Sequence, residues 1–227
     1  MRVEIDTHTH TLASGHAYNT LNEMAQAAAD KGLKGHAPEM PGTCHLFYFQ
    51  NLRIVPRKKY GIELLLGTEL NIMNVRGETD LPDSVLERLD IAIASIHMPC
   101  FKAERTIDNV TAAYEKVMEH PYVDIIGHPD DGRFPVDMKR LVKKAKETGT
   151  LLEVNNSSLR PEGFRENTKE NCLEMVKECK AHGVMIVLGS DSHLDADIAE
   201  YPYAEEILRE TDFPEELVAN VSLEKLK

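Results

Sequence analysis

The sequence predicts an α/β barrel of parallel strands, and three observations lead to this fold class. Apolar runs of strand length alternate with segments of helical periodicity along the chain, a pattern typical of a parallel sheet covered by helices. Neither a break in composition nor a linker divides the 227 residues, so we expect a single domain over 1–227. A histidine, aspartate or glutamate follows strand after strand, and a closed barrel carries its functional groups at the carboxyl ends of its strands.

In the first half of the chain, the strands are expected at the apolar runs VEID, IELLLG and DIAIASI, at residues 3–6, 62–67 and 90–96. Thr20 and Glu23 form a capping box that begins a helix, and Gly32 after Lys31 ends it. The strand that should follow this helix barely fits into residues 33–36. A shorter helix is expected over 81–89, and apolar spacing predicts another over 106–120.

In the second half, strands are expected at VDIIG, LLEV and MIVLG, at residues 123–127, 151–154 and 185–189. Asp137 caps a basic helix that runs to Gly149. Further helices are expected over 168–182, 204–209 and 215–220.

The composition restricts the classes of partner. With 38 acidic and 26 basic residues the formal net charge is −12, which argues against a nucleic-acid binder because lysine and arginine supply most of that affinity. No apolar run reaches membrane-spanning length, and the charged start of the chain does not resemble a signal peptide. The four cysteines form no CxxC motif, so we expect reduced thiols in a cytoplasmic protein. The sequence leaves the oligomeric state open.

The residues at the expected strand ends are the types that bind divalent cations. Side chains alternate along a strand, so His8 and His10 project the same way, about 6.5 Å apart, although the pair alone would also fit a solvated strand end. Seven histidines and two carboxylates are too many for one tetrahedral site, and they suggest two or three cations bridged by Glu69 and Asp191. Clustered cations favour hydrolysis of a phosphoester. The candidates are His8, His10, His16, His36, Glu69, His97, His128, Asp191 and His193.

Six motifs resemble a known family. They are DTHTHTLASGHAY, ELNI after Gly-Thr, SIHMP, IIGHP, EVNNSS and LGSDSH. Together they closely resemble the PHP (polymerase and histidinol phosphatase) family, above all its stand-alone YcdX-type phosphatase branch. The resemblance implies a single PHP domain that forms a distorted (β/α)7 barrel with a trinuclear metal site. Zinc is the expected metal, with manganese or iron as alternatives.

The resemblance also implies roles for individual residues. His8, His10, Glu69 and Asp191 resemble the ligands of one metal, and Glu69 would bridge to a second metal held by His97 and His128. His16, His36 and His193 resemble the ligands of a third. Glu69, Asp191 and His193 would be catalytic, with a metal-bridging hydroxide as nucleophile and a small phosphorylated molecule as substrate.

Four further residues are candidates for substrate binding. Arg160 and Arg165 follow the NNSS segment, and a guanidinium can hold a phosphate through two hydrogen bonds, although a solvated surface arginine is the better explanation for each taken singly. Asn156 and Ser158 are candidates for holding metal ligands through hydrogen bonds.

The sequence departs from the family before His36. Lys31-Gly-Leu-Lys-Gly runs directly into His36, where relatives have an apolar strand that ends in Thr-Asp-His or Thr-Glu-His. About five residues are absent, roughly 16 Å of strand. Three explanations stay open: the helix unwinds to provide strand, the second strand is missing or distorted so that His36 does not reach its metal, or residues are missing from the sequence.

Two other functions compete with phosphoester hydrolysis. An amidohydrolase-like hydrolase also begins with H-x-H on a barrel strand, but it usually needs a bridging lysine, and the strand end here offers Glu69. A metal-binding protein without activity is the second alternative, because the shortened strand could have removed catalysis.

Overall fold

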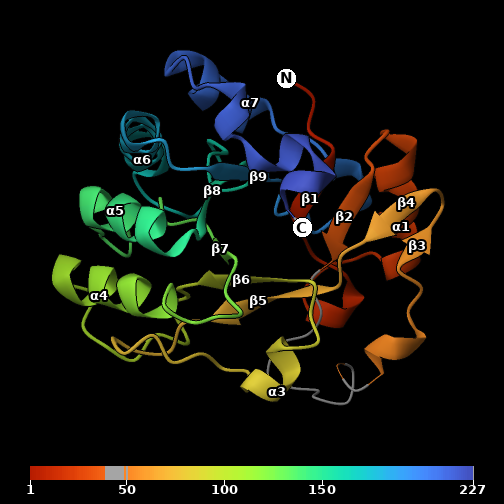
Figure 1. Cartoon of the computed structure of the whole chain (residues 1–227), viewed down its shortest axis with the longest axis horizontal. Coiled ribbons are helices and arrows are strands. Elements are labelled where there is room, and N and C mark those ends of the chain that lie inside the picture. Colours follow the sequence, from red (N-terminus) through yellow and green to blue (C-terminus); the bar gives the residue numbers. More distant parts are fainter. Residues whose placement is uncertain (39–48, 50, 227) are drawn as a thin grey trace.

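The chain folds into parallel strands at the centre with helices along the outside (Figure 1). The structure, a computed structural model, describes residues 1–38, 49 and 51–226. Cys44 and His45, which the sequence places in an aromatic loop, lie outside the described residues. The other cysteines, Cys100, Cys172 and Cys179, are free thiols, as expected.

The strands form two sheets. One has the order β1-β2-β4-β3, in which β3 is antiparallel and the other strands are parallel. The other has the order β5-β6-β7-β8-β9 and is parallel throughout. The bounds are Ile5–Thr9 (β1), Gly35–Pro38 (β2), Lys58–Lys59 (β3), Ile62–Leu64 (β4), Gly67–Asn71 (β5), Ile91–Ser95 (β6), Ile125–Ile126 (β7), Leu151–Asn155 (β8) and Ile186–Gly189 (β9).

The two sheets follow one another around the molecule. Only Leu65 and Leu66 separate β4 from β5, so the single strand expected over 62–67 is divided between the sheets. At the other edge β9 lies beside β1, and a parallel bridge joins Thr9 to Ser192. This order of neighbours is consistent with a distorted barrel, and it brings the carboxyl ends of the parallel strands to one side.

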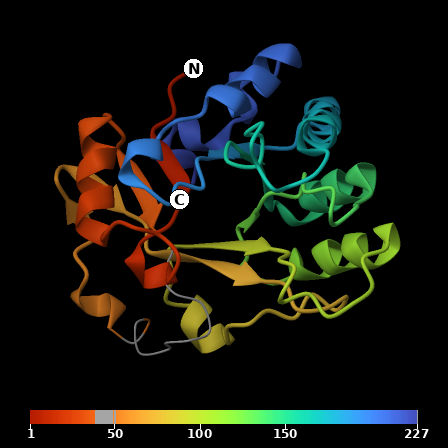
Figure 2. The ribbon, with the colours of Figure 1, turned by 180° about the vertical axis from the view of Figure 1, so that it is seen from behind.

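The helices cover the outer side of the strands. Figure 2 shows α4, α5 and α6 side by side along the five-stranded sheet, while α1 covers the other sheet. Their bounds are Leu21–Asp30 (α1), Asp83–Leu86 (α3), Ile107–Val117 (α4), Met138–Thr148 (α5), Thr168–His182 (α6) and Pro202–Glu210 (α7). The predicted capping box of Thr20 and Glu23 is confirmed, and so is the cap that Asp137 provides for α5.

The predicted helix over 215–220 is wrong. The segment forms two short 3-10 turns, Glu215–Leu217 and Ala219–Val221, on either side of an extended Val218. Tertiary contacts override the local pattern, because Val218 makes a parallel bridge with Ile186. The buried amide of Asn220 donates to the carbonyls of Ile5 and Leu188 (both 2.8 Å) and accepts from the Leu188 N–H (3.0 Å). This side chain therefore links β1 to β9.

The second strand is present, short and irregular. Residues 35–38 pair with β1, and the register shifts between Asp6 and Thr9. Helix α1 still has 10 residues, and Gly32 follows it with a φ of 79°, the left-handed conformation that suits glycine. Helix α1 therefore keeps the length that its capping signals predict, and β2 forms after it.

Two groups of apolar side chains form the core. The larger packs the strands against the helices. The smaller lies among the strands and includes Ile5, Ile93, Ile125 and Val187, together with Ala219 from the C-terminal segment. Within the described residues, every helix is too short or too polar to cross a lipid bilayer.

Candidate metal centre

Side chains of the types that bind metals, from or just after five strands, meet at one side of the molecule. His8 lies in β1 and Glu69 in β5. His10, His97, His128 and Asp191 follow within two residues of the ends of β1, β6, β7 and β9, and His16 and His193 lie in the loops after β1 and β9. Three groups have ligand atoms within 4.8 Å of one another, and together they contain eight of the nine candidates. The groups are His8, His10 and Asp191; Glu69, His97 and His128; and His10, His16 and His193.

Four ligand atoms around His8 have the dimensions of a tetrahedral site. The Nε2 atoms of His8 and His10 are 3.2 Å apart, and the Asp191 Oδ1 is 3.7 Å from the first and 3.0 Å from the second. The Glu69 Oε2 lies 3.6 Å and 3.8 Å from the same two nitrogens. Ligands about 2.0–2.2 Å from a tetrahedral ion are about 3.3–3.6 Å from each other. Both the donor types and their spacing fit a divalent cation.

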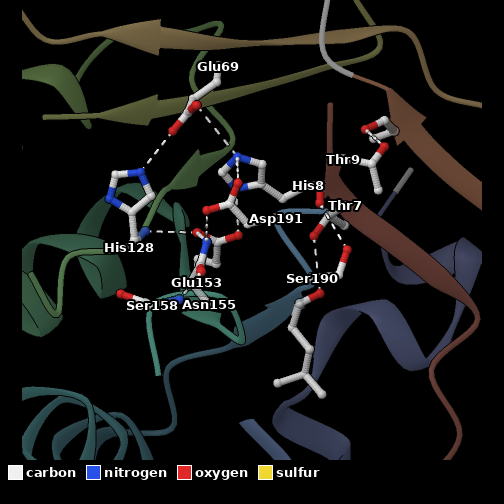
Figure 3. Close-up of polar contacts among 12 residues, drawn as sticks. Thr7, His8, Thr9, Glu69, His128, Glu153, Asn155, Ser158, Ser190 and Asp191 are labelled. Atoms are coloured by element: carbon white, nitrogen blue, oxygen red, sulfur yellow. Dashed lines mark hydrogen bonds and ion pairs between the residues drawn. The ribbon is translucent and has the colours of Figure 1, made fainter. Parts of the chain in front are cut away.

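Glu69 joins this group to a second one. Figure 3 shows its carboxylate between the rings of His128 and His8. The Glu69 Oε1 lies 2.9 Å from the Nε2 of His128 and 3.3 Å from the Nε2 of His97, while its Oε2 faces His8 and His10. One oxygen therefore faces each group, which is the arrangement expected of a bridging carboxylate.

The third group contains His10, whereas the family resemblance implied His36 as the partner of His16 and His193. Ring centroids of His10 and His193 are 4.1 Å apart, and those of His16 and His193 are 4.8 Å apart. Within the described part of the chain, the three groups do not include His36. It pairs with Asp6, two residues before His8, and its Nδ1 lies 3.1 Å from the Thr9 Oγ1. The shortened strand leaves His36 buried below the strand ends.

The charged side chains of the candidate metal centre shift one another's pKa values. Burial by itself would lower the pKa of His8, but the carboxylates of Glu153, Asp191 and Glu69 raise it well above its usual value. Burial would raise the pKa of Asp191, but the charge of His8 and the hydrogen bond from His10, together with Arg165, hold it well below its usual range. Positive charge, from a proton or a cation, is therefore strongly favoured between these groups.

Two of the candidate ligands lie on strained backbone. His128 has a φ of 31° and Asp191 a φ of 53°, a left-handed conformation that costs a non-glycine residue about 1–3 kcal/mol. The N–H of His128 donates to the Glu153 carboxylate (2.8 Å), and the N–H of Asp191 donates to the His8 carbonyl (2.9 Å). These hydrogen bonds hold the backbone so that both side chains turn toward the centre.

A cavity of about 460 Å³ opens onto the candidate ligands His10, His16, Glu69, His97, Asp191 and His193. Arg165 lines it, mostly buried, and donates to the Asp191 Oδ2 (3.2 Å). Arg160 and Ser158 also line it, and Arg160 pairs with Asp197 (3.1 Å).

Asn156 lies away from this cavity. Its Oδ1 accepts the backbone N–H groups of Tyr203 and Ala204 at the start of α7 (3.0 and 3.2 Å). Its neighbour Asn155 makes the contact with a candidate ligand, donating from Nδ2 to the Asp191 Oδ2 (3.2 Å).

The sequence reasoning missed two residues of β8. Glu153 accepts from His8, and Asn155 contacts both Glu153 and Asp191. A signal was available: two polar side chains at alternate positions of a buried strand share one face, and buried polar groups require partners. Glu153 falls within the strand expected over 151–154 and Asn155 in the segment expected after it, so the face that the two side chains share was not recognised.

The sequence matches the PHP domain family over residues 6–159, more than half of the chain. The chain belongs to the PHP family. Two relatives, each named a probable phosphatase, come from Clostridium novyi and Caldicellulosiruptor saccharolyticus. The first is 47% identical over 100% of this chain and 93% of the relative, and the second is 45% identical over 99% and 94%.

Solved structures share the fold. The histidinol phosphate phosphatase of Lactococcus lactis, solved with zinc, L-histidinol and phosphate, superposes with a TM-score of 0.64 at 15% identity over 94% of this chain and 95% of that chain. A putative histidinol phosphatase from Listeria monocytogenes gives a TM-score of 0.59 at 17% identity, over 86% and 97%. The match to the PHP family model confirms the predicted family, and the predicted α/β fold of parallel strands agrees with both structures.

Proposed function

We propose that this chain hydrolyses the ester bond of a small phosphorylated molecule at a centre of three divalent cations. The coarser assignment, a phosphatase of the PHP family, follows from the family match and from the relatives named as phosphatases. Zinc is the proposed metal, because imidazole nitrogens dominate the donor set and the Lactococcus lactis enzyme was solved with zinc.

One observation carries the proposal: the three donor groups are not separate. His10 belongs to two groups, and the carboxylate of Glu69 faces two groups with different oxygens. Donors shared in this way would hold neighbouring cations close together. Divalent cations at such a spacing supply Lewis acidity to a phosphoryl group and bring the pKa of a water molecule toward neutrality.

The residues of the cavity fit an anionic substrate of modest size. A volume of about 460 Å³ is within the range of small-molecule sites. Arg160 and Arg165 line the cavity, and we propose that they hold the phosphate, because a guanidinium matches phosphate geometry. Glu69 and Asp191 would fix the cations beneath it, and His193, partly exposed at the cavity, would lie nearest the reacting group.

The amidohydrolase-like alternative has less support. It needs a lysine between the cations, and among the described residues that line the cavity the cationic side chains besides histidine are arginines. For the inactive metal-binding alternative the observations point both ways, since His36 lies outside the groups while the other eight candidates remain together. Experiment decides this alternative.

Metal analysis and an activity assay on the same preparation test the proposal. The protein is purified without chelator, its metal content is measured by mass spectrometry, and turnover of p-nitrophenyl phosphate and of phosphorylated metabolites, including histidinol phosphate, is assayed. The control is Asp124→Asn, at the amino end of β7, which should keep metal and activity. Three cations with turnover are expected. Bound cations without turnover of any substrate would favour the inactive alternative, and absence of bound cations would refute the centre.

A further inference from the structure

Glu153 lies in the middle of the site although it belongs to none of the three donor groups. It is a residue of β8 with no exposed surface, between β7 and β9. Figure 3 places it close to Asp191 and Asn155, on the far side of the His8 ring from Glu69. Burying a carboxylate costs free energy unless it is paired and hydrogen-bonded, so the partners of Glu153 indicate its role.

Three donors converge on this carboxylate. The Oε1 lies 2.8 Å from the His8 Nδ1. The Oε2 accepts the backbone N–H of His128 (2.8 Å) and the side-chain N–H of Asn155 (3.1 Å). Through these contacts one side chain reaches a ligand of the first group and a ligand of the second. Asn155 extends the network to Asp191, because its amide also donates to the Asp191 Oδ2 (3.2 Å).

Two glycines leave the space that the carboxylate occupies. A Cβ at Gly189 would lie 1.9 Å from the Glu153 Oε1, closer than atoms can approach. A Cβ at Gly127 would lie 3.5 Å from the Oε2 and 2.2 Å from the Ser95 Oγ. The neighbouring strands β7 and β9 therefore carry glycine next to the Glu153 carboxylate, which indicates that the fold leaves space for this side chain.

We propose that Glu153 is a positioning residue of the metal centre: its carboxylate keeps the ring hydrogen of His8 on Nδ1, so that the Nε2 lone pair faces the cation. The same carboxylate holds the strained backbone of His128 through its N–H. The role rests on the metal centre proposed above. It agrees with a general pattern, since metal-binding histidines usually donate their other ring N–H to an oxygen acceptor.

An amide could not do the same work. A carboxylate only accepts, whereas a glutamine has one accepting oxygen and a donating NH₂ group. If the glutamine oxygen faces His8, its NH₂ group faces the donors of His128 and Asn155. If the glutamine is flipped, its NH₂ group faces the His8 Nδ1, and the ring hydrogen must move to Nε2, where the cation should bind. Either orientation weakens the centre.

The test compares Glu153→Gln with the wild type and with Asp124→Asn, which replaces a carboxylate that accepts one backbone N–H at the other end of the strands. Zinc affinity is measured by competition with a chromophoric chelator, and folding of each variant without metal is followed by circular dichroism. We expect Glu153→Gln to bind zinc about 10–100-fold more weakly, the usual effect of losing such a partner, and Asp124→Asn to bind normally. Equal zinc affinity in a folded Glu153→Gln protein refutes the role.

A second measurement needs no variant. Nitrogen NMR of the zinc-loaded wild type with isotope-labelled histidine reports which ring nitrogen of His8 carries hydrogen, and a role in packing alone would not set this. Hydrogen on Nδ1 and zinc on Nε2 are expected, and zinc on Nδ1 overturns the proposal even if Glu153→Gln fails to fold. If the wild type binds no zinc, manganese or iron, the proposed function itself falls, which is a distinct result from normal zinc binding by Glu153→Gln.

Discussion

Replacing His36 by asparagine should make the protein more resistant to acid. His36 is fully buried in β2, and burial lowers its pKa to about 3. The Thr9 hydroxyl donates to the Ala37 carbonyl (2.8 Å), so it accepts from the His36 Nδ1–H (3.1 Å), and the Nε2 has no hydrogen-bond partner among the described residues. An asparagine keeps a donor near the Nδ1 position and removes the titrating ring.

The size of the effect follows from the two pKa values. In the unfolded chain His36 takes up a proton below its ordinary pKa of 6.5, whereas in the folded protein it stays neutral down to about 3. As the pH falls below 6.5 the unfolded state therefore gains protons that the native state cannot bind, and stability is lost. At pH 5 this amounts to about 2 kcal/mol, from about 1.4 kcal/mol per pH unit over about 1.5 units.

The free energy of unfolding is measured with urea at pH 7.5 and pH 5, in chelator, for the wild type and His36→Asn. Any packing defect of the variant is present at both pH values and cancels in the comparison. We expect the wild type to lose about 2 kcal/mol more than the variant between the two pH values. Equal losses would show that His36 titrates normally. His36→Asn should also retain its bound metal, whereas a loss of one cation would identify His36 as a ligand after all.

Three further predictions concern the centre and the strand arrangement. Asp191→Ala should abolish turnover and lower the bound metal by at least one ion per chain, because Oδ1 lies within 3.0 Å of His10; near-normal activity would contradict the assigned site. When each cation is supplied at about a hundred times its Kd, removing it with a chelator should lower the melting temperature by about 5–10 °C per cation. A melting temperature that does not change when zinc is added would argue against specific binding. Asn220→Ala should reduce the free energy of unfolding by about 2–4 kcal/mol, since it leaves backbone groups of Ile5 and Leu188 without partners; a loss under about 0.5 kcal/mol in urea would exclude this link between β1 and β9.

The order of strands and helices could be predicted from the sequence because both depend on local patterns. The capping box at Thr20, the cap at Asp137 and the apolar runs are signals within a few residues of the elements they define. Most of the candidate ligands could be found for the same reason: each directly follows an apolar run, and parallel strands bring such positions to one side. The prediction of a helix over 215–220 was wrong because the conformation of this segment depends on a bridge to Ile186, far away in the sequence.

The tertiary structure decided which of these side chains meet. His36 has the right residue type after the right helix, but pairing with Asp6 fixes its height along the strands, and a short strand leaves it below the other histidines. Glu153 belongs to the EVNNSS motif, but that motif does not reveal its partners, and its importance depends on the His8 ring and the His128 N–H that two other strands bring to it. The sequence alone determined which functional groups lie at each strand end, and only strand register and packing determined the distances between those groups.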